Sequence, residues 1–201
     1  MADRPGEARA HYARSRAIYE ELGMTFALAA RAVIPAGIEQ MAGDLEAAER
    51  ELSAGHDRLA AIGENELRST IAAALAHVLH EQGRDDEAEQ YARASEEAAA
   101  EDDVGSQVLW RSALAKVLGR RDGSAAALEL ARDAVALAAT TDMLSLHGAT
   151  LLDLARVEAL LNGGVAPPAL VAEARALFER KGDTASLRRA AAEFAGPVAV
   201  R

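Results

Sequence analysis

Apolar residues recur at steps of three and four along most of the chain, which is the spacing of one face of an α-helix. In 44–62 the stripe consists of Leu45, Ala48, Leu52, Gly55, Leu59 and Ile62. Shorter stripes of the same kind occupy 85–100, 124–139 and 168–181. Almost no segment alternates apolar and polar residues as a half-buried strand would. The pattern therefore predicts an all-α protein.

Four glycines stand just before or close to these stripes, each 40 residues from the next: Gly43, Gly83, Gly123 and Gly163. A glycine just past a helix end supplies the left-handed backbone conformation that stops the helix. Each repeat is therefore expected to be a first helix, a tight turn and a second helix, as in helical-repeat proteins with periods of about 34 to 47 residues. The first helices are expected near 25–42, 65–82, 104–119 and 143–161.

These boundaries predict one repeat domain over 1–201 with about nine or ten helices. The expected helix pairs are 24–63, 64–102, 103–140 and 142–181. A helix over 7–22 precedes them without a first helix of its own, and a capping helix over 183–195 follows. The array thus begins in the middle of a repeat. We expect a tail detached from a larger regulator, or a partner docked where the missing helix would lie, including a homodimer through the open N-terminal helix.

Small residues hold matching places in the first helices, within "LAHVL" (75–79), "LAKVL" (114–118) and "LARVE" (154–158). The small residues are Ala76, Ala115 and Ala155, with Ala36 in the first repeat. They leave room for a neighbouring helix to approach closely. A larger side chain there is expected to overpack the contact, at a cost of about 1–3 kcal/mol.

The spacing of small residues after the turn glycines resembles the tetratricopeptide repeat. Gly83 is followed by Ala88 and Ser95, and Gly43 by Ala48 and Gly55. The period near 40 exceeds the family's usual 34, and most repeats lack a closing proline. This longer form looks like the helical-repeat tails of bacterial LuxR-type transcription activators and cyclase-linked ATPases, most of all in 83–121. The resemblance implies a right-handed superhelical solenoid whose concave groove takes a peptide or helix, in a bacterial signalling or transcription-regulatory system.

Composition narrows the choice of partners. The chain has 32 acidic and 22 basic residues and a formal charge of −10. Such a surface repels nucleic-acid phosphates and anionic membranes, so neither is an expected partner. There is no cysteine, and we see neither a signal-peptide core nor an apolar run of about 18 residues that would cross a bilayer. We expect a cytoplasmic protein.

Residues that could carry chemistry are scattered. His77 and His80, with Glu81 adjacent, share a helix face and could reach one metal, but no third ligand stands at a useful spacing. A solvated helix end is the favoured interpretation. The densest carboxylate cluster, expected to be an exposed acidic corner, is Glu96, Glu97, Glu101, Asp102 and Asp103. With no phosphate loop or nucleophile motif either, we expect no catalytic residue, no metal and no cofactor.

His77, Lys116 and Arg156 each follow the small alanine of their helix. In the tetratricopeptide pattern this position faces the concave groove, so the resemblance implies that these residues contact a ligand. Cations in an acidic protein would suit a carboxylate or an acidic segment. The alternative is that each cation complements the end of its own helix or pairs with a nearby acid.

Two further residues bear on packing. Trp110 is expected in the core, because large aromatic side chains anchor contacts between helices. Pro35 lies inside the expected helix 25–42, and proline there should kink or break the helix.

The sequence therefore predicts a non-catalytic protein- or peptide-binding module, with an acidic partner favoured. The alternative is a small-molecule sensor, the regulatory tail of an ATPase-type transcription regulator, which would need an enclosed pocket with converging polar groups. The third candidate is a metal-dependent enzyme that uses His77 and His80.

Overall fold

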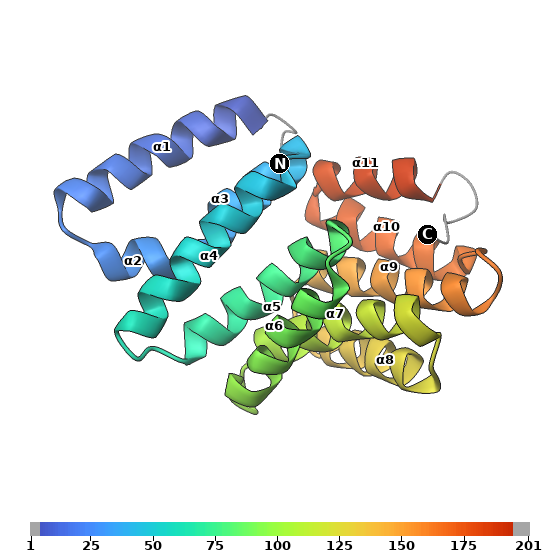
Figure 1. Ribbon diagram of the computed structural model, residues 1–201. Coiled ribbons are helices and arrows are strands. Elements are labelled where there is room, and N and C mark those ends of the chain that lie inside the picture. The colour runs from blue at the N-terminus through green and yellow to red at the C-terminus, as the bar shows by residue number, and fades with distance from the viewer. Residues whose placement is uncertain (1–4, 195–201) are drawn as a thin grey trace. The chain divides into compact units, whose positions relative to one another are not determined.

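A computed structural model of the chain describes residues 5–194 (Figure 1). Over this range the chain forms eleven helices and no strand, which confirms the all-α prediction. None of the helices in this range is both long and apolar enough to cross a membrane. The last residue of the expected capping helix, 195, lies outside the described residues.

The described helices fall into two compact units, 5–100 and 101–194. The N-terminal unit contains α1 (Pro5–Glu21), α2 (Thr25–Ala30), α3 (Val33–Ala42), α4 (Leu45–Ala61), α5 (Glu66–Glu81) and α6 (Asp85–Ala98). Within it, α3 packs on α4, α4 on α5 and α5 on α6, while α1 lies along α3 and also contacts α2 (Figure 1).

The C-terminal unit contains α7 (Val104–Asp122), α8 (Ala125–Ala139), α9 (Leu144–Leu161), α10 (Pro168–Lys181) and α11 (Thr184–Glu193). Each helix packs on the next, and α9 also contacts both α7 and α11. In this unit, α7, α9 and α11 therefore form a row of alternate helices. That row positions the charged side chains described below.

The helix expected over 25–42 is broken into α2 and α3, so residues 5–194 form eleven helices where nine or ten were expected. Pro35 is the third residue of α3 and explains the break. It has no N–H to donate to the carbonyl of Arg31, and its ring would clash with that carbonyl in a continuous helix. Instead, the Ala32 amide bonds to the Ala29 carbonyl at 3.2 Å, which closes α2 with three-residue spacing.

Small residues permit close packing in both units. Ala36, Ala76, Ala115 and Ala155 are all buried, as their positions in the sequence predict. Two glycines allow still closer approach. A Cβ on Gly148 would lie 2.7 Å from Cε1 of Phe178, and one on Gly55 would lie 2.4 Å from Cβ of Ala32.

The turn glycines have the expected backbone conformation, with φ of +79° at Gly43 and +81° at Gly83. Trp110 is 5% exposed, in agreement with its predicted place in the core. Its indole N–H donates to Oε1 of Gln107 at 3.1 Å, and the Arg111 guanidinium lies over its ring. The indole therefore has a polar partner as well as an apolar environment.

Candidate functional site

Lys116 on α7 and Arg156 on α9, two residues predicted to bind a ligand, meet at Asp153. Nζ of Lys116 lies 3.3 Å from Oδ1 of Asp153, and Nη1 of Arg156 donates to the same oxygen. The Ser112 hydroxyl donates to the other carboxylate oxygen. The side chains of Lys116 and Asp153 are only 6% and 8% exposed. Both charges are therefore held away from water, where each needs an opposite charge.

Arg156 extends this arrangement to α11. Its guanidinium donates to both carboxylate oxygens of Glu193, which is a bidentate pair of the strong, charge-assisted kind. Its carbon Cζ also lies 5.6 Å from the ring centroid of Phe194. We call Ser112, Lys116, Asp153, Arg156 and Glu193 the charge cluster. It joins α7, α9 and α11 and contains two cations and two carboxylates.

The charge cluster bears on the predicted ligand contacts. It gives Lys116 and Arg156 nearby acids, as the alternative interpretation of these residues supposed. His77 lies on α5 of the N-terminal unit and is partly buried. A ligand role for the three residues stays a prediction.

One of the two histidines considered as metal ligands, His80, pairs with a carboxylate. His80 Nδ1 lies 2.8 Å from Oδ1 of Asp85, and both side chains are mostly buried. Between residues 5 and 194, no group of three or more potential ligand side chains is placed to hold a metal ion.

An apolar cleft of about 480 Å³ lies beside α10 in the same C-terminal unit. Its walls are Val165, Ala166, Pro168, Val171, Ala172, Arg175 and Phe194. Phe194 connects the cleft to the charge cluster, because the same ring lies near the Arg156 guanidinium. The lining is apolar except for Arg175.

Arg175 is exposed on α10 at this cleft. Within the part of the chain that the structure describes, its guanidinium has no hydrogen bond or ion pair. Sequence reasoning did not single it out. Its position between Ala174 and Phe178 of the apolar stripe marks it as a polar neighbour of that stripe, but only the return of Phe194 toward α10 makes a cleft there.

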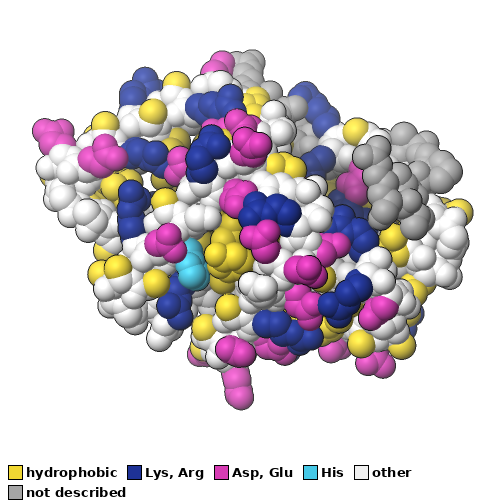
Figure 2. All heavy atoms as spheres, viewed as in Figure 1, with side chains coloured by type: hydrophobic (Ala, Val, Ile, Leu, Met, Phe, Trp, Pro, Cys, Tyr) yellow, Lys and Arg dark blue, Asp and Glu magenta, His cyan; other side chains and the backbone are white. Residues whose placement is uncertain are grey.

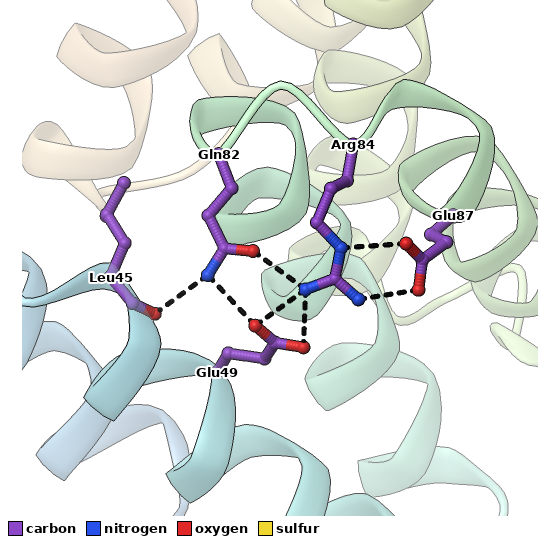
Figure 3. A network of polar contacts seen from close by, with 5 residues as sticks. All are labelled: Leu45, Glu49, Gln82, Arg84 and Glu87. Atoms are coloured by element: carbon purple, nitrogen blue, oxygen red, sulfur yellow. Dashed lines mark hydrogen bonds and ion pairs between the residues drawn. The ribbon is translucent and has the colours of Figure 1, made fainter.

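A second polar network lies in the N-terminal unit, where Arg84 bridges α4 and α6 (Figure 3). Its Nη1 lies 2.7 Å from Oε1 of Glu49, and its Nη2 lies 2.6 Å from Oε2 of Glu87. Gln82 donates to Oε2 of Glu49 at 2.9 Å and to the carbonyl of Leu45 at 3.2 Å. This network fastens the turn between α5 and α6 to the start of α4.

The network lowers the pKa of two of its carboxylates, those of Glu49 and Glu87. Burial alone would raise the pKa of Glu49, but the hydrogen bonds from Arg84 and Gln82 outweigh it and lower the pKa below its ordinary value of 4.5. The hydrogen bond from Arg84 likewise lowers the pKa of Glu87. Acidic and basic side chains are interspersed in the same way over much of the face in Figure 2.

No protein-family model matches the chain, and no curated protein matches it. The resemblance to tetratricopeptide repeats therefore rests on the spacing of glycines and alanines and stays a prediction.

Proposed function

We propose that the chain is a non-catalytic protein- or peptide-binding module, and that the cleft beside α10 takes a segment carrying an apolar side chain next to a carboxylate. The observation that supports this proposal is an exposed arginine without an ion pair, Arg175, at the edge of an apolar cleft. A place in bacterial signalling or transcription regulation is part of the proposal and rests on the sequence resemblance.

The cleft has the dimensions and chemistry that such a segment needs. Its volume of about 480 Å³ falls within the usual range for ligand sites. Burying one Leu or Phe side chain against the apolar wall would contribute about 1.5–3 kcal/mol. Arg175 would add a bidentate pair with a carboxylate, and this pair would fix the orientation of the segment.

Electrostatics limits how an acidic segment would bind. The formal charge of −10 repels an acidic partner as it approaches. Recognition would therefore depend on contacts made inside the cleft and not on long-range attraction. A slow association rate and a dependence on Arg175 are both expected.

The experiment is a binding survey with fluorescent peptides that vary one apolar residue and its distance from a glutamate, read by anisotropy. Arg175→Glu is expected to weaken the best peptide at least about tenfold, and Val171→Asp is expected to weaken it as well. The matched control is Arg180→Glu, an exposed arginine on the same helix that does not line the cleft. Failure of every peptide to bind, or equal losses from Arg175→Glu and Arg180→Glu, would contradict the proposal.

The volume of the cleft also supports a second candidate, the small-molecule sensor. Short aliphatic or aromatic carboxylates would fit the same apolar wall and guanidinium. Such compounds would then raise the melting temperature of the chain by themselves, because a ligand that binds only the folded state stabilises it. A rise with peptides but not with these compounds favours the binding module.

A further inference from the structure

The N-terminal unit leaves an unusual concentration of apolar side chains in contact with solvent. Leu22 is 66% exposed, Ile18 57% and Phe26 50%, and Met24 and Ile34 are more than two-fifths exposed. These residues come from the last turn of α1, the link to α2, α2 itself and the first turn of α3. We call them the N-terminal apolar edge. Single exposed apolar residues are ordinary, but a succession of large ones marks an interaction surface.

Charge distinguishes this edge from the rest of the chain. Residues 5–31 contain four arginines and three glutamates, for a net charge of +1, while the remaining residues carry −11. Even with Glu39 and Glu51, the partners of Arg9 and Arg16, counted in, this region carries only −1. Two copies of the chain would therefore repel each other less here than over most of their surfaces. Association through the edge meets less of the repulsion that opposes other contacts between copies.

The charges at the edge also complement themselves. Glu20 and Glu21 are exposed and have no ion pair within the described residues. Arg14 and Arg31 are exposed on the same stretch of chain, with Arg31 stacked over the ring of Tyr19. In a two-fold dimer the same surface of both copies is in contact. If that surface carries both signs of charge, an acidic side chain of one copy can pair with a basic side chain of the other.

We propose that a second copy of this chain covers the N-terminal apolar edge, giving a two-fold homodimer held by Ile18, Leu22 and Phe26. This interface lies in the N-terminal unit, whereas the cleft lies in the C-terminal unit. The dimer proposal does not depend on the function proposed for the cleft. Charged residues of one copy, Glu20 and Glu21, would face the arginines of the other around the apolar centre. Such an arrangement of an apolar centre and a polar rim is common at stable interfaces.

Sedimentation equilibrium over a wide range of protein concentration tests the proposal. The chain is expected to approach twice its monomer mass of 21.1 kDa. Leu22→Asp and Phe26→Asp are each expected to raise the dissociation constant at least about tenfold, because each buries an unpaired charge at the interface. Circular dichroism would check that both variants keep their helices.

The matched control is Ile62→Asp, which introduces the same charge at a residue that is 61% exposed but lies outside the edge. It is expected to leave the dissociation constant unchanged. A monomer at every concentration would overturn the proposal and leave the edge to a different protein. A dimer that tolerates Leu22→Asp and Phe26→Asp, or that Ile62→Asp weakens equally, would overturn it too.

Discussion

The N-terminal unit exposes more large apolar side chains than the C-terminal unit does. Among residues 5–194, eight of the eleven large hydrophobic side chains that stay exposed belong to the N-terminal unit. The contrast is sharpest between α1, which has 17 residues and none buried, and α7, which has 19 residues and eleven buried. The N-terminal unit thus keeps apolar surface that a partner can cover, while the C-terminal unit has already buried most of its own.

The two units also place their ion pairs differently. The side chains of Arg84 and its partners Glu49 and Glu87 are 40%, 26% and 48% exposed. In the charge cluster, Lys116 and Asp153 are below one-tenth exposed and Arg156 is 18% exposed. The same residue types therefore carry different energetic weight, since a solvated pair contributes little while a buried charge depends strongly on its partner.

The largest effect is expected at the buried carboxylate. Asp153→Ala leaves the Lys116 ammonium buried without the Asp153 carboxylate and should lower the free energy of unfolding by about 3–5 kcal/mol. In the N-terminal unit, Glu49→Ala should cost less than about 1 kcal/mol. Urea titration followed by circular dichroism measures both changes.

A double variant gives the control for this prediction. Lys116→Met with Asp153→Leu replaces the buried pair with apolar side chains and should recover part of the stability lost in Asp153→Ala. Equal losses from Asp153→Ala and Glu49→Ala would show that burial does not separate the two networks.

Intermediate effects are expected at the two close glycines. Gly148→Ala drives a methyl group into the ring of Phe178, and Gly55→Ala drives one into Ala32. Each should destabilise the chain by about 1–3 kcal/mol, even though alanine favours a helix. Thermal unfolding of the two variants measures the losses.

Rescue variants locate the cause of each loss. Phe178→Leu should restore part of the stability lost in Gly148→Ala but none of that lost in Gly55→Ala. Ala32→Gly should restore part of the stability lost in Gly55→Ala but none of that lost in Gly148→Ala. Gly37→Ala is the control, because a methyl group there meets no neighbour. It should stabilise α3 by up to about 1 kcal/mol. A loss at Gly37 as large as at Gly148 would contradict the packing explanation.

The smallest effect is a dependence on pH. The pKa of Glu49 is lowered in the folded chain, so its stabilising contribution is complete above its ordinary value of 4.5 and is lost as pH falls through the lowered pKa. Glu49→Gln should therefore be less stable than the unchanged chain at neutral pH, and the two stabilities should converge in acid. Urea titration at a series of pH values measures this.

Glu46→Gln provides the comparison, since it removes a carboxylate from an exposed position of the same helix. The stability difference between Glu46→Gln and the unchanged chain should vary less with pH than the difference for Glu49→Gln. An equal variation with pH for the two variants would contradict the assigned role of the Arg84 contact.

Local patterns were sufficient to predict the helices. Apolar spacing gave their positions to within a few residues, because one face of each helix is buried and the other is not. The buried alanines followed from the same register. The break between α2 and α3 lies at Arg31 and Ala32, earlier than Pro35, because proline disturbs the turn that precedes it.

The site depended on pairings that local patterns do not contain. Lys116 and Asp153 are 37 residues apart. The sequence of neither helix indicates that these two side chains pair. One signal was present: Asp153 stands alone inside the apolar run of α9, between Leu152 and Leu154. A lone carboxylate in such a run indicates a buried charge that needs a cation. The cleft at Arg175 had no comparable signal, because it exists only where Phe194 returns to α10.

The absence of buried side chains on α1 has a consequence for how that helix responds to its surroundings. Two ion pairs, Arg9–Glu39 and Arg16–Glu51, link it to α3 and α4. Exposed pairs weaken as dissolved ions screen them, with a Debye length of about 10 Å at 0.1 M. Ionic strength should therefore set how quickly the amides of α1 exchange with deuterium, while those of α7 stay protected.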